Sequence, residues 1–272
     1  MELSLARLHF YQALQPDVIN LAEAALYIAQ EEYPQLEVAS YLTMLDQMAA
    51  QVQLPSDRYP LKIIQAINRL LYEELGFSGN SQDYYDPRNS FLNDVLNRRT
   101  GIPITLSLIY LEIAQRLDFP MIGVGFPGHF LIRPDLEEIG IYVDCFERGE
   151  ILFEQDCQAR LQQLYELYGA EVKLEPRFFN PINPRQFLVR MLTNLKQIYL
   201  NQGEIGKCLA VVERILLVTP EALMELRDRG VLFYHLGCWN EARQDLNRYL
   251  LSDPDREDQA MIQNLLKKMD DQ

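Results

Sequence analysis

Three stretches near the start of the chain repeat apolar residues with helical spacing. In the first, residues 16–33, apolar positions recur every three or four residues, at Ile19, Ala22, Leu26 and Ala29. Pro16 suits the first turn of this helix. The same period continues through residues 36–52 and 60–77, and Gly76 is placed to end the third helix. The pattern predicts an N-terminal helical region, residues 1–80.

The pattern changes in the middle of the chain. The segment Pro103–Leu117 is apolar on nearly every side, which predicts a helix buried on most of its surface. After Pro120 follow four short β-rich runs separated by turn signals, "MIGVGF", "HFLIR", "IGIYVDCF" and "EILF". A central helix followed by a small antiparallel sheet is an α+β arrangement, and we assign this core to residues 81–178.

The last region, residues 179–272, is repetitive. Three pairs of residues stand 34 positions apart: Gly203 and Gly237, Pro220 and Pro254, Leu216 and Leu250. This period, with two helices in each repeat, resembles the tetratricopeptide pattern. Small residues at Gly230 and Ala242 would let paired helices approach closely. Two repeats are few for a free-standing solenoid, so we expect residues 255–269 to form a closing helix. The chain as a whole is therefore expected to be mostly helical.

Composition and charge narrow the function classes. With 272 residues, 48% of them hydrophobic, the chain is long enough for well-packed cores. The formal charge of −14 makes nucleic acid an unlikely partner, because that association rests on Lys and Arg. The longest apolar stretch, Ile102–Ala114, is too short to cross a bilayer and contains Glu112, so no membrane insertion is expected. The N-terminus lacks the features of a secretory signal, which favours a cytoplasmic location.

One long stretch carries a family resemblance. Residues 89–133, "NSFLNDVLNRRTGIPITLSLIYLEIAQRLDFPMIGVGFPGHFLIR", are followed by "YVDCF" and then by the repeats. Together they resemble the SirB-type bacterial proteins, which have a transglutaminase-like core and C-terminal tetratricopeptide repeats. The resemblance covers about residues 16–266. It implies a papain-like core, and in the wider superfamily that core carries a Cys-His-Asp triad.

The resemblance places the triad positions on this sequence. The histidine falls on His129 and the aspartate on Asp144, whereas the cysteine position falls on or beside Pro103. Proline has no nucleophilic atom, although its ring suits the first turn of a helix. If the loop between the second and third runs spans residues 134–139, antiparallel pairing sets His129 directly opposite Asp144. We therefore expect the two side chains to lie within hydrogen-bonding reach.

Other residues near this site have alternative interpretations. Thr105 and Ser107, in the first turns of the central helix, are weak candidates for a substitute nucleophile beside the histidine. The more ordinary expectation is that their hydroxyls bond back to the preceding helical turn. Cys145 neighbours Asp144 on its strand, so its side chain should point to the opposite face and be a small buried residue. The other cysteines, Cys157, Cys208 and Cys238, are expected to be reduced thiols.

The segment before the central helix supplies candidate binding residues. Four of its polar side chains and the proline that follows could line a groove leading to the histidine: Asn89, Asn93, Arg98, Arg99 and Pro103. Helix capping by Asn89 or Ser90 and simple solvation of the arginines are the alternatives. Glu112 needs a partner if buried, such as Arg99 or Arg133. The sequence shows no phosphate-binding loop and no metal-ligand spacing, so we expect neither a cofactor nor a metal.

Two function classes remain open. The first is a non-catalytic transglutaminase-like protein whose groove and repeats bind protein partners, in a regulatory or assembly role. The second is a hydrolase or acyltransferase that combines His129 and Asp144 with Ser107 or Thr105. The missing cysteine and the repeats favour the first class, whereas the retained His-Asp pair favours the second.

Overall fold

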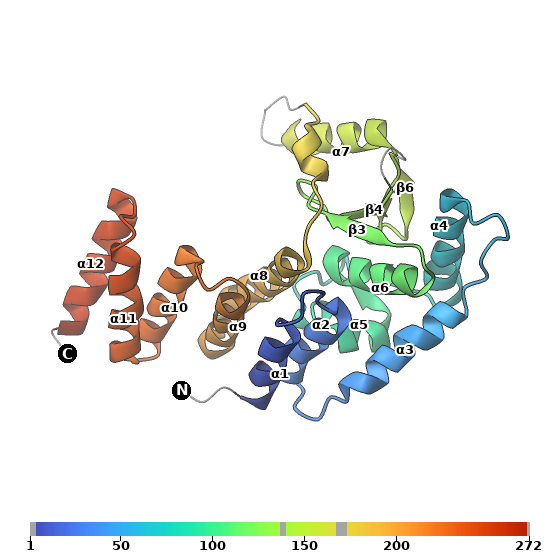
Figure 1. Cartoon of the computed structure of the whole chain (residues 1–272). Coiled ribbons are helices and arrows are strands. Elements are labelled where there is room, and N and C mark those ends of the chain that lie inside the picture. Colours follow the sequence, from blue (N-terminus) through green and yellow to red (C-terminus); the bar gives the residue numbers. More distant parts are fainter. Residues whose placement is uncertain (1–3, 137–139, 167–172, 271–272) are drawn as a thin grey trace. The chain divides into compact units, whose positions relative to one another are not determined.

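The computed structural model of the chain describes residues 4–136, 140–166 and 173–270. These residues divide into two compact units, residues 1–187 and 188–272, and each is considered by itself (Figure 1). Unit 1 holds the N-terminal helices and the sheet, and unit 2 holds only helices among its described residues. The predicted α+β, mostly helical fold is confirmed.

Unit 1 begins with four helices: α1 (Leu5–Ala13), α2 (Leu21–Gln30), α3 (Val38–Ala50) and α4 (Pro60–Asn68). The sequence pattern did not predict α1. It also started the next helix too early, at Pro16. The helix begins at Leu21 because the Asn20 side chain caps it, accepting a hydrogen bond from Glu23 N–H at 3.0 Å.

The fourth helix ends as the sequence predicts, but by an unexpected route. Its last turns widen into a π-helix, η1 (Arg69–Glu74), which ends before Gly76. This glycine has a φ of +74°, the left-handed conformation that commonly terminates helices. The widened turn faces the core, where Leu70, Leu71 and Tyr72 are buried.

The next elements lead into the central helix. They are β1 (Ser78–Gly79), the 3-10 turn η2 (Pro87–Asn89), α5 (Leu92–Arg98), β2 (Thr100–Gly101) and α6 (Pro103–Arg116). The short strands β1 and β2 pair in parallel. Pro103 is the first residue of α6, and eleven of the fourteen residues of α6 are buried, as the all-round apolar pattern predicts.

Four strands form the antiparallel sheet, in the order β3-β4-β5-β6. Their bounds are β3 (Met121–Val124), β4 (Leu131–Pro134), β5 (Tyr142–Asp144) and β6 (Glu150–Leu152). All four coincide with the predicted β-rich runs, although β4 continues one residue beyond "HFLIR", to Pro134. The sheet lies between α6 and α7 (Glu154–Glu166), which contact it from opposite faces (Figure 1).

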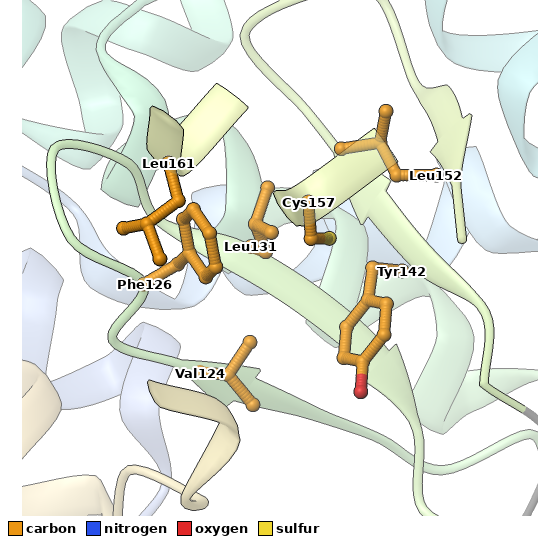
Figure 2. Packing of buried hydrophobic residues seen from close by; sticks show 7 residues of the cluster. All are labelled: Val124, Phe126, Leu131, Tyr142, Leu152, Cys157 and Leu161. Atoms are coloured by element: carbon orange, nitrogen blue, oxygen red, sulfur yellow. The ribbon is translucent and has the colours of Figure 1, made fainter. Parts of the chain in front are cut away.

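Side chains from the sheet and α7 form one hydrophobic cluster (Figure 2). Its buried members are Val124, Phe126, Leu131, Tyr142, Leu152, Cys157 and Leu161. The 3-10 turn η3 (Pro176–Phe179) adds aromatic rings, and Phe179 stacks on Tyr142 with ring centroids 4.4 Å apart. This cluster fixes α7 against the sheet, next to the turn that carries His129.

Unit 2 begins within α8 (Pro184–Gln202) and continues through α9 (Ile205–Val218), α10 (Leu223–His235), α11 (Trp239–Leu250) and α12 (Arg256–Asp270). The predicted helix pairs and closing helix are confirmed. A Cβ at Gly230 would lie 2.7 Å from the Leu246 side chain, so α10 and α11 pack closely only because this residue is glycine. Ala242 is fully buried at the same contact.

The described residues offer neither a membrane span nor a metal-binding cluster. Among them, no helix combines the length and the apolar character that crossing a bilayer requires. The same residues contain no group of three His, Cys, Asp or Glu side chains arranged to hold a metal ion.

Candidate functional site

Asp144 lies at the end of β5, where its side chain organises the following turn. Its Oδ1 accepts hydrogen bonds from the backbone N–H groups of Phe146 (3.0 Å) and Glu147 (3.3 Å). Its Oδ2 pairs with the Arg160 guanidinium and lies 3.7 Å from His129 Nδ1. The Asp144 side chain is only 2% exposed, whereas that of His129 is 37% exposed. The site is thus a buried carboxylate with a half-buried imidazole above it.

The imidazole reaches the carboxylate by a different register from the predicted one. Strands β4 and β5 pair Ile132 with Val143, which shifts the alignment by two residues, so His129 is not directly opposite Asp144. His129 instead lies in the turn before β4, where its backbone N–H donates a hydrogen bond to the Phe126 carbonyl at 3.0 Å. At 3.7 Å the Nδ1–Oδ2 distance suits an ion pair and exceeds that of an ordinary hydrogen bond.

Arg160, on α7, is the site residue that the sequence analysis missed. It bridges Asp144 and Glu150, whose Oε2 lies 2.6 Å from Nη2. Burial alone would raise the pKa of the Asp144 carboxyl, but the His129 and Arg160 interactions outweigh burial, so that pKa lies below its usual range. A buried carboxylate on a strand needs more than one partner, so the sequence did indicate that Asp144 would pair with a further cation. Nothing in the sequence distinguished Arg160 among the later arginines.

Pro103, Thr105 and Ser107 lie in the first turns of α6. Pro103 occupies the first helical position, on or beside which the resemblance places the triad cysteine. Two residues later, Thr105 is fully buried; its Oγ1 accepts from Ile102 N–H at 3.1 Å and lies 2.7 Å from the Asn89 carbonyl, to which it donates. A further contact of 3.1 Å to the Ile102 carbonyl matches the predicted bond to the preceding turn. The Thr105 hydroxyl therefore ties two backbone segments together.

Ser107 differs from its predicted arrangement. Its hydroxyl is fully buried and makes no hydrogen bond of ordinary geometry within the described residues, so the expected bond to the preceding turn is absent. Its polar neighbour is the Cys145 thiol, whose pKa burial raises to about 12. Cys145 is fully buried, as predicted. Neither group is accessible to a substrate from solvent.

The predicted binding residues hold the segment before α6 in place. Asn89 is fully buried; its Nδ2 donates to the Asp83 carbonyl at 2.7 Å, and its Oδ1 lies 3.4 Å from Arg98 Nη1. Arg98 also pairs with Asp86. Arg99 ends α5 with a φ of +56° and donates to the Leu75 carbonyl at 2.8 Å. Within the described chain, these hydrogen bonds run to neighbouring loops rather than to the imidazole.

The capping and buried polar residues of this region differ from the expected arrangement. Neither Asn89 nor Ser90 caps α5, because the chain is still turning through η2 there and the helix begins after Phe91. Asn93 is buried on α5, and its Oδ1 has no hydrogen-bond partner in the described part of the chain. Glu112 is buried, but its partner is Arg116, one helical turn away at 2.5 Å, instead of Arg99 or Arg133. Proximity along α6 provides that pairing directly.

An aromatic ring, Phe126, lies next to the imidazole and links it to further aromatic residues. Phe126 lies 6.3 Å from the His129 ring centroid and contacts both Phe178 and Phe179. Figure 2 shows Phe126 and Leu161 close together at this end of the cluster. The imidazole therefore has both a charged carboxylate and an apolar aromatic ring among its neighbours.

Comparison with known proteins gives the chain its relatives. Residues 39–193 match the transglutaminase-like superfamily, and residues 195–267 match the tetratricopeptide repeat. A UPF0162 protein of Xylella fastidiosa is 37% identical over 256 residues, which cover 92% of this chain and 90% of that protein. A UPF0162 protein of Pseudomonas aeruginosa is 32% identical, covering 89% of this chain and 88% of that protein.

Two further matches are less complete. The human F-box only protein 21 is 34% identical over 194 residues, 66% of this chain but only 29% of that protein. Among solved structures, the crystal structure of menin matches with a TM-score of 0.44 at 11% identity, over 89% of this chain and 68% of that chain. Because of the length and identity of the bacterial matches, the chain belongs to the UPF0162 family, within the transglutaminase-like superfamily.

Proposed function

We propose that the chain is a non-catalytic transglutaminase-like protein that acts by binding other proteins, in a regulatory or assembly role. The supporting observation is the start of α6: the resemblance puts the nucleophile position on or beside Pro103, and Pro103 is the first residue of the helix. A triad cysteine reacts as a thiolate, and proline provides no atom that could do so. We also propose that the chain is a relative of the SirB-type proteins that it resembles.

The two hydroxyls nearby do not replace the missing thiol. A serine or threonine nucleophile must contact both a base and the substrate carbonyl. Thr105 is committed to backbone groups and Ser107 is sealed beside a buried thiol, and both side chains are fully buried. The retained His129–Asp144 proximity favours the hydrolase alternative, but Arg160 already holds the carboxylate that would orient the imidazole.

The imidazole is better suited to recognition. His129 is 37% exposed, lies at ion-pair distance from a buried carboxylate and stands beside Phe126. Such a side chain can bond to a peptide carbonyl or carboxylate while the ring contacts apolar atoms. We propose that partners contact the core here, through a surface that includes His129.

The tail supplies the second binding surface in this proposal. Tetratricopeptide helices stack into curved arrays that present extended surfaces to other proteins. The array in unit 2 is rigidified by charge: Lys196 Nζ, on α8, lies 2.7 Å from Glu225 and 2.5 Å from Asp228, both on α10. Arg227 continues the network to Asp258 on α12 at 2.8 Å. Rigid helix pairs favour a preformed docking surface over one that folds on binding.

The decisive experiment combines chemical labelling with partner capture. A fluorophosphonate probe should leave Thr105 and Ser107 unlabelled in the purified chain, measured by intact mass and peptide mapping. In affinity capture from native lysate, His129→Ala should reduce recovery of specific partners by roughly three- to tenfold, a typical effect of one interface residue. His9→Ala is the matched control, because His9 lies on α1 and its Nδ1 contacts Gln30 at 3.2 Å. Labelling of either hydroxyl that disappears in His129→Ala would establish the hydrolase instead.

A further inference from the structure

A groove on unit 1 lies apart from the imidazole site. Its volume is about 280 Å³, slightly below the usual range of ligand pockets. One wall is the loop before α2, the floor is α6 and β3, and the other wall is the segment leading into α8. Representative lining residues are Val18, Ile19, Leu111, Met121, Ile182 and Phe187. A groove of this size accepts a short segment or one or two side chains rather than a large ligand.

The floor of the groove includes an open edge of the sheet. Strand β3 is an outer strand, and its Gly123 carbonyl points away from β4 to accept the Ile182 N–H at 2.9 Å. Peptide groups alternate sides along a strand, so the N–H and C=O of Met121 point outward too. Its partner on β4 is Pro134, which has no N–H that could bond to the Met121 carbonyl. Met121 therefore directs one donor and one acceptor into the groove.

The chain itself shows how this edge is used. Pro181 forms an antiparallel bridge with Val124, so residues 181–182 already act as a very short added strand. The segment cannot continue along the edge, because Asn183 turns it into α8. The Asn183 Oδ1 accepts from Gln186 N–H at 2.9 Å, while its own N–H donates to Gln186 Oε1 at 3.0 Å. Because the chain turns away at Asn183, it does not pair with the strand edge beside Met121.

The electrostatics of the groove favour an uncharged occupant. Glu112 is the acidic residue at its margin, and its two oxygens are engaged by the Ala22 N–H (3.2 Å) and by Arg116 (2.5 Å). A cation in the groove would have to compete with Arg116 for this carboxylate. The remaining walls are mainly aliphatic, with Val18 82% exposed at the rim. Aliphatic side chains therefore fit the groove better than charged ones.

We propose that this groove binds an extended, uncharged segment of a partner protein, which adds as a short antiparallel strand beside Met121. The segment extends the arrangement that residues 181–182 begin: its main chain pairs with the Met121 N–H and C=O, and an aliphatic side chain enters the groove. This inference rests on the proposal that the chain works by binding proteins. It names a second site and the chemistry of its occupant.

The test uses a defined peptide and the full-length chain. The probe is a capped hexapeptide of alternating threonine and valine, with uncharged terminal glutamines added for solubility, titrated against isotope-labelled protein. We expect its binding to shift the Met121 amide resonance and slow hydrogen exchange there. A peptide N-methylated at alternate amides, on the edge that pairs, should lose this binding. The aspartate variant Val18→Asp should weaken affinity roughly tenfold or more, because it brings a charge to an apolar contact.

A matched control and the contrary outcomes complete the design. Leu5→Asp changes an apolar residue of similar exposure, 68%, at the start of α1 and should leave affinity unchanged. Equal binding of the N-methylated peptide would show that the strand edge is not used and overturn the proposal. Self-association that Val18→Asp abolishes, measured by sedimentation, would make a second copy the occupant and overturn it too. Failure at this groove leaves the His129 capture result intact, so the two proposals can be separated.

Discussion

Gly149 closes the turn between β5 and β6 at a point of very close approach. Its φ is +74°, and a Cβ there would lie 2.2 Å from Asn68 Oδ1 and 2.6 Å from the Tyr72 ring. An L residue in this conformation costs about 1–2 kcal/mol. Asn68 would also have to move, losing its 2.7 Å hydrogen bond to the Gly149 carbonyl, about 1 kcal/mol, and overpacking adds about 1–3 kcal/mol. We expect Gly149→Ala to lower the free energy of unfolding of unit 1 by about 3–6 kcal/mol.

Gly76 provides a control with the same backbone angle. Its φ is also +74°, but a Cβ at this position would meet no heavy atom within 4 Å. Gly76→Ala should therefore cost only the backbone contribution, about 1–2 kcal/mol. The difference between the two variants isolates the contact with Asn68 and Tyr72.

Urea unfolding followed by far-UV circular dichroism measures both variants. The sole tryptophan, Trp239, lies in unit 2, so its fluorescence follows that unit separately and guards against a transition that is not two-state. Equal losses in Gly149→Ala and Gly76→Ala would refute the reasoning, because the close approach would then contribute nothing. A loss confined to the tryptophan signal would also contradict it.

Three further predictions concern the candidate site. Arg160→Met should raise the pKa of Asp144, because the guanidinium helps to hold that pKa low. A carboxyl whose pKa is lowered in the fold contributes stability that is lost as pH falls, so the variant should have a lower free energy of unfolding at neutral pH and a shallower loss on acidification. Carboxyl NMR measures the pKa, and acid unfolding measures the stability. Thr105→Val should cost about 1–3 kcal/mol in urea unfolding because buried backbone groups lose their partner, whereas Ser107→Ala should cost less than about 1 kcal/mol because its hydroxyl makes no hydrogen bond of ordinary geometry to the described residues. The Cys145 thiol, with its pKa raised to about 12 by burial, should resist iodoacetamide at pH 8 until the chain unfolds, as mass spectrometry will show.

The architecture was largely predictable because it depends on periodicity. The helix beginning at Pro103 and the four short strands follow from apolar spacing and turn residues, which act over a few positions. The repeats were equally readable, since Gly230 and Ala242 mark the close contact between α10 and α11. The start of α2 was misjudged because a proline and an asparagine competed as signals, and the asparagine cap at Asn20 determined the boundary.

The site was only partly predictable because its contacts join distant segments. The proximity of His129 and Asp144 follows from the family resemblance, but the strand register depended on the unknown length of a turn. Arg160 lies on a helix sixteen residues beyond its carboxylate, and no local pattern marks it. The Glu112 partner was misjudged for the opposite reason: Arg116, one turn along the same helix, was the local candidate and was overlooked in favour of more distant arginines.

The burial of α6 also constrains how the chain can be made. This helix is encoded ahead of every strand of the sheet that covers it, and eleven of its fourteen residues are removed from solvent in the finished unit. During synthesis the segment Pro103–Arg116 emerges from the ribosome while β3–β6 are still inside or unmade. An apolar helix without its cover invites aggregation, so unit 1 should depend on holding chaperones until about residue 152 is released. The tail, which follows later, can form its helix pairs from local contacts alone.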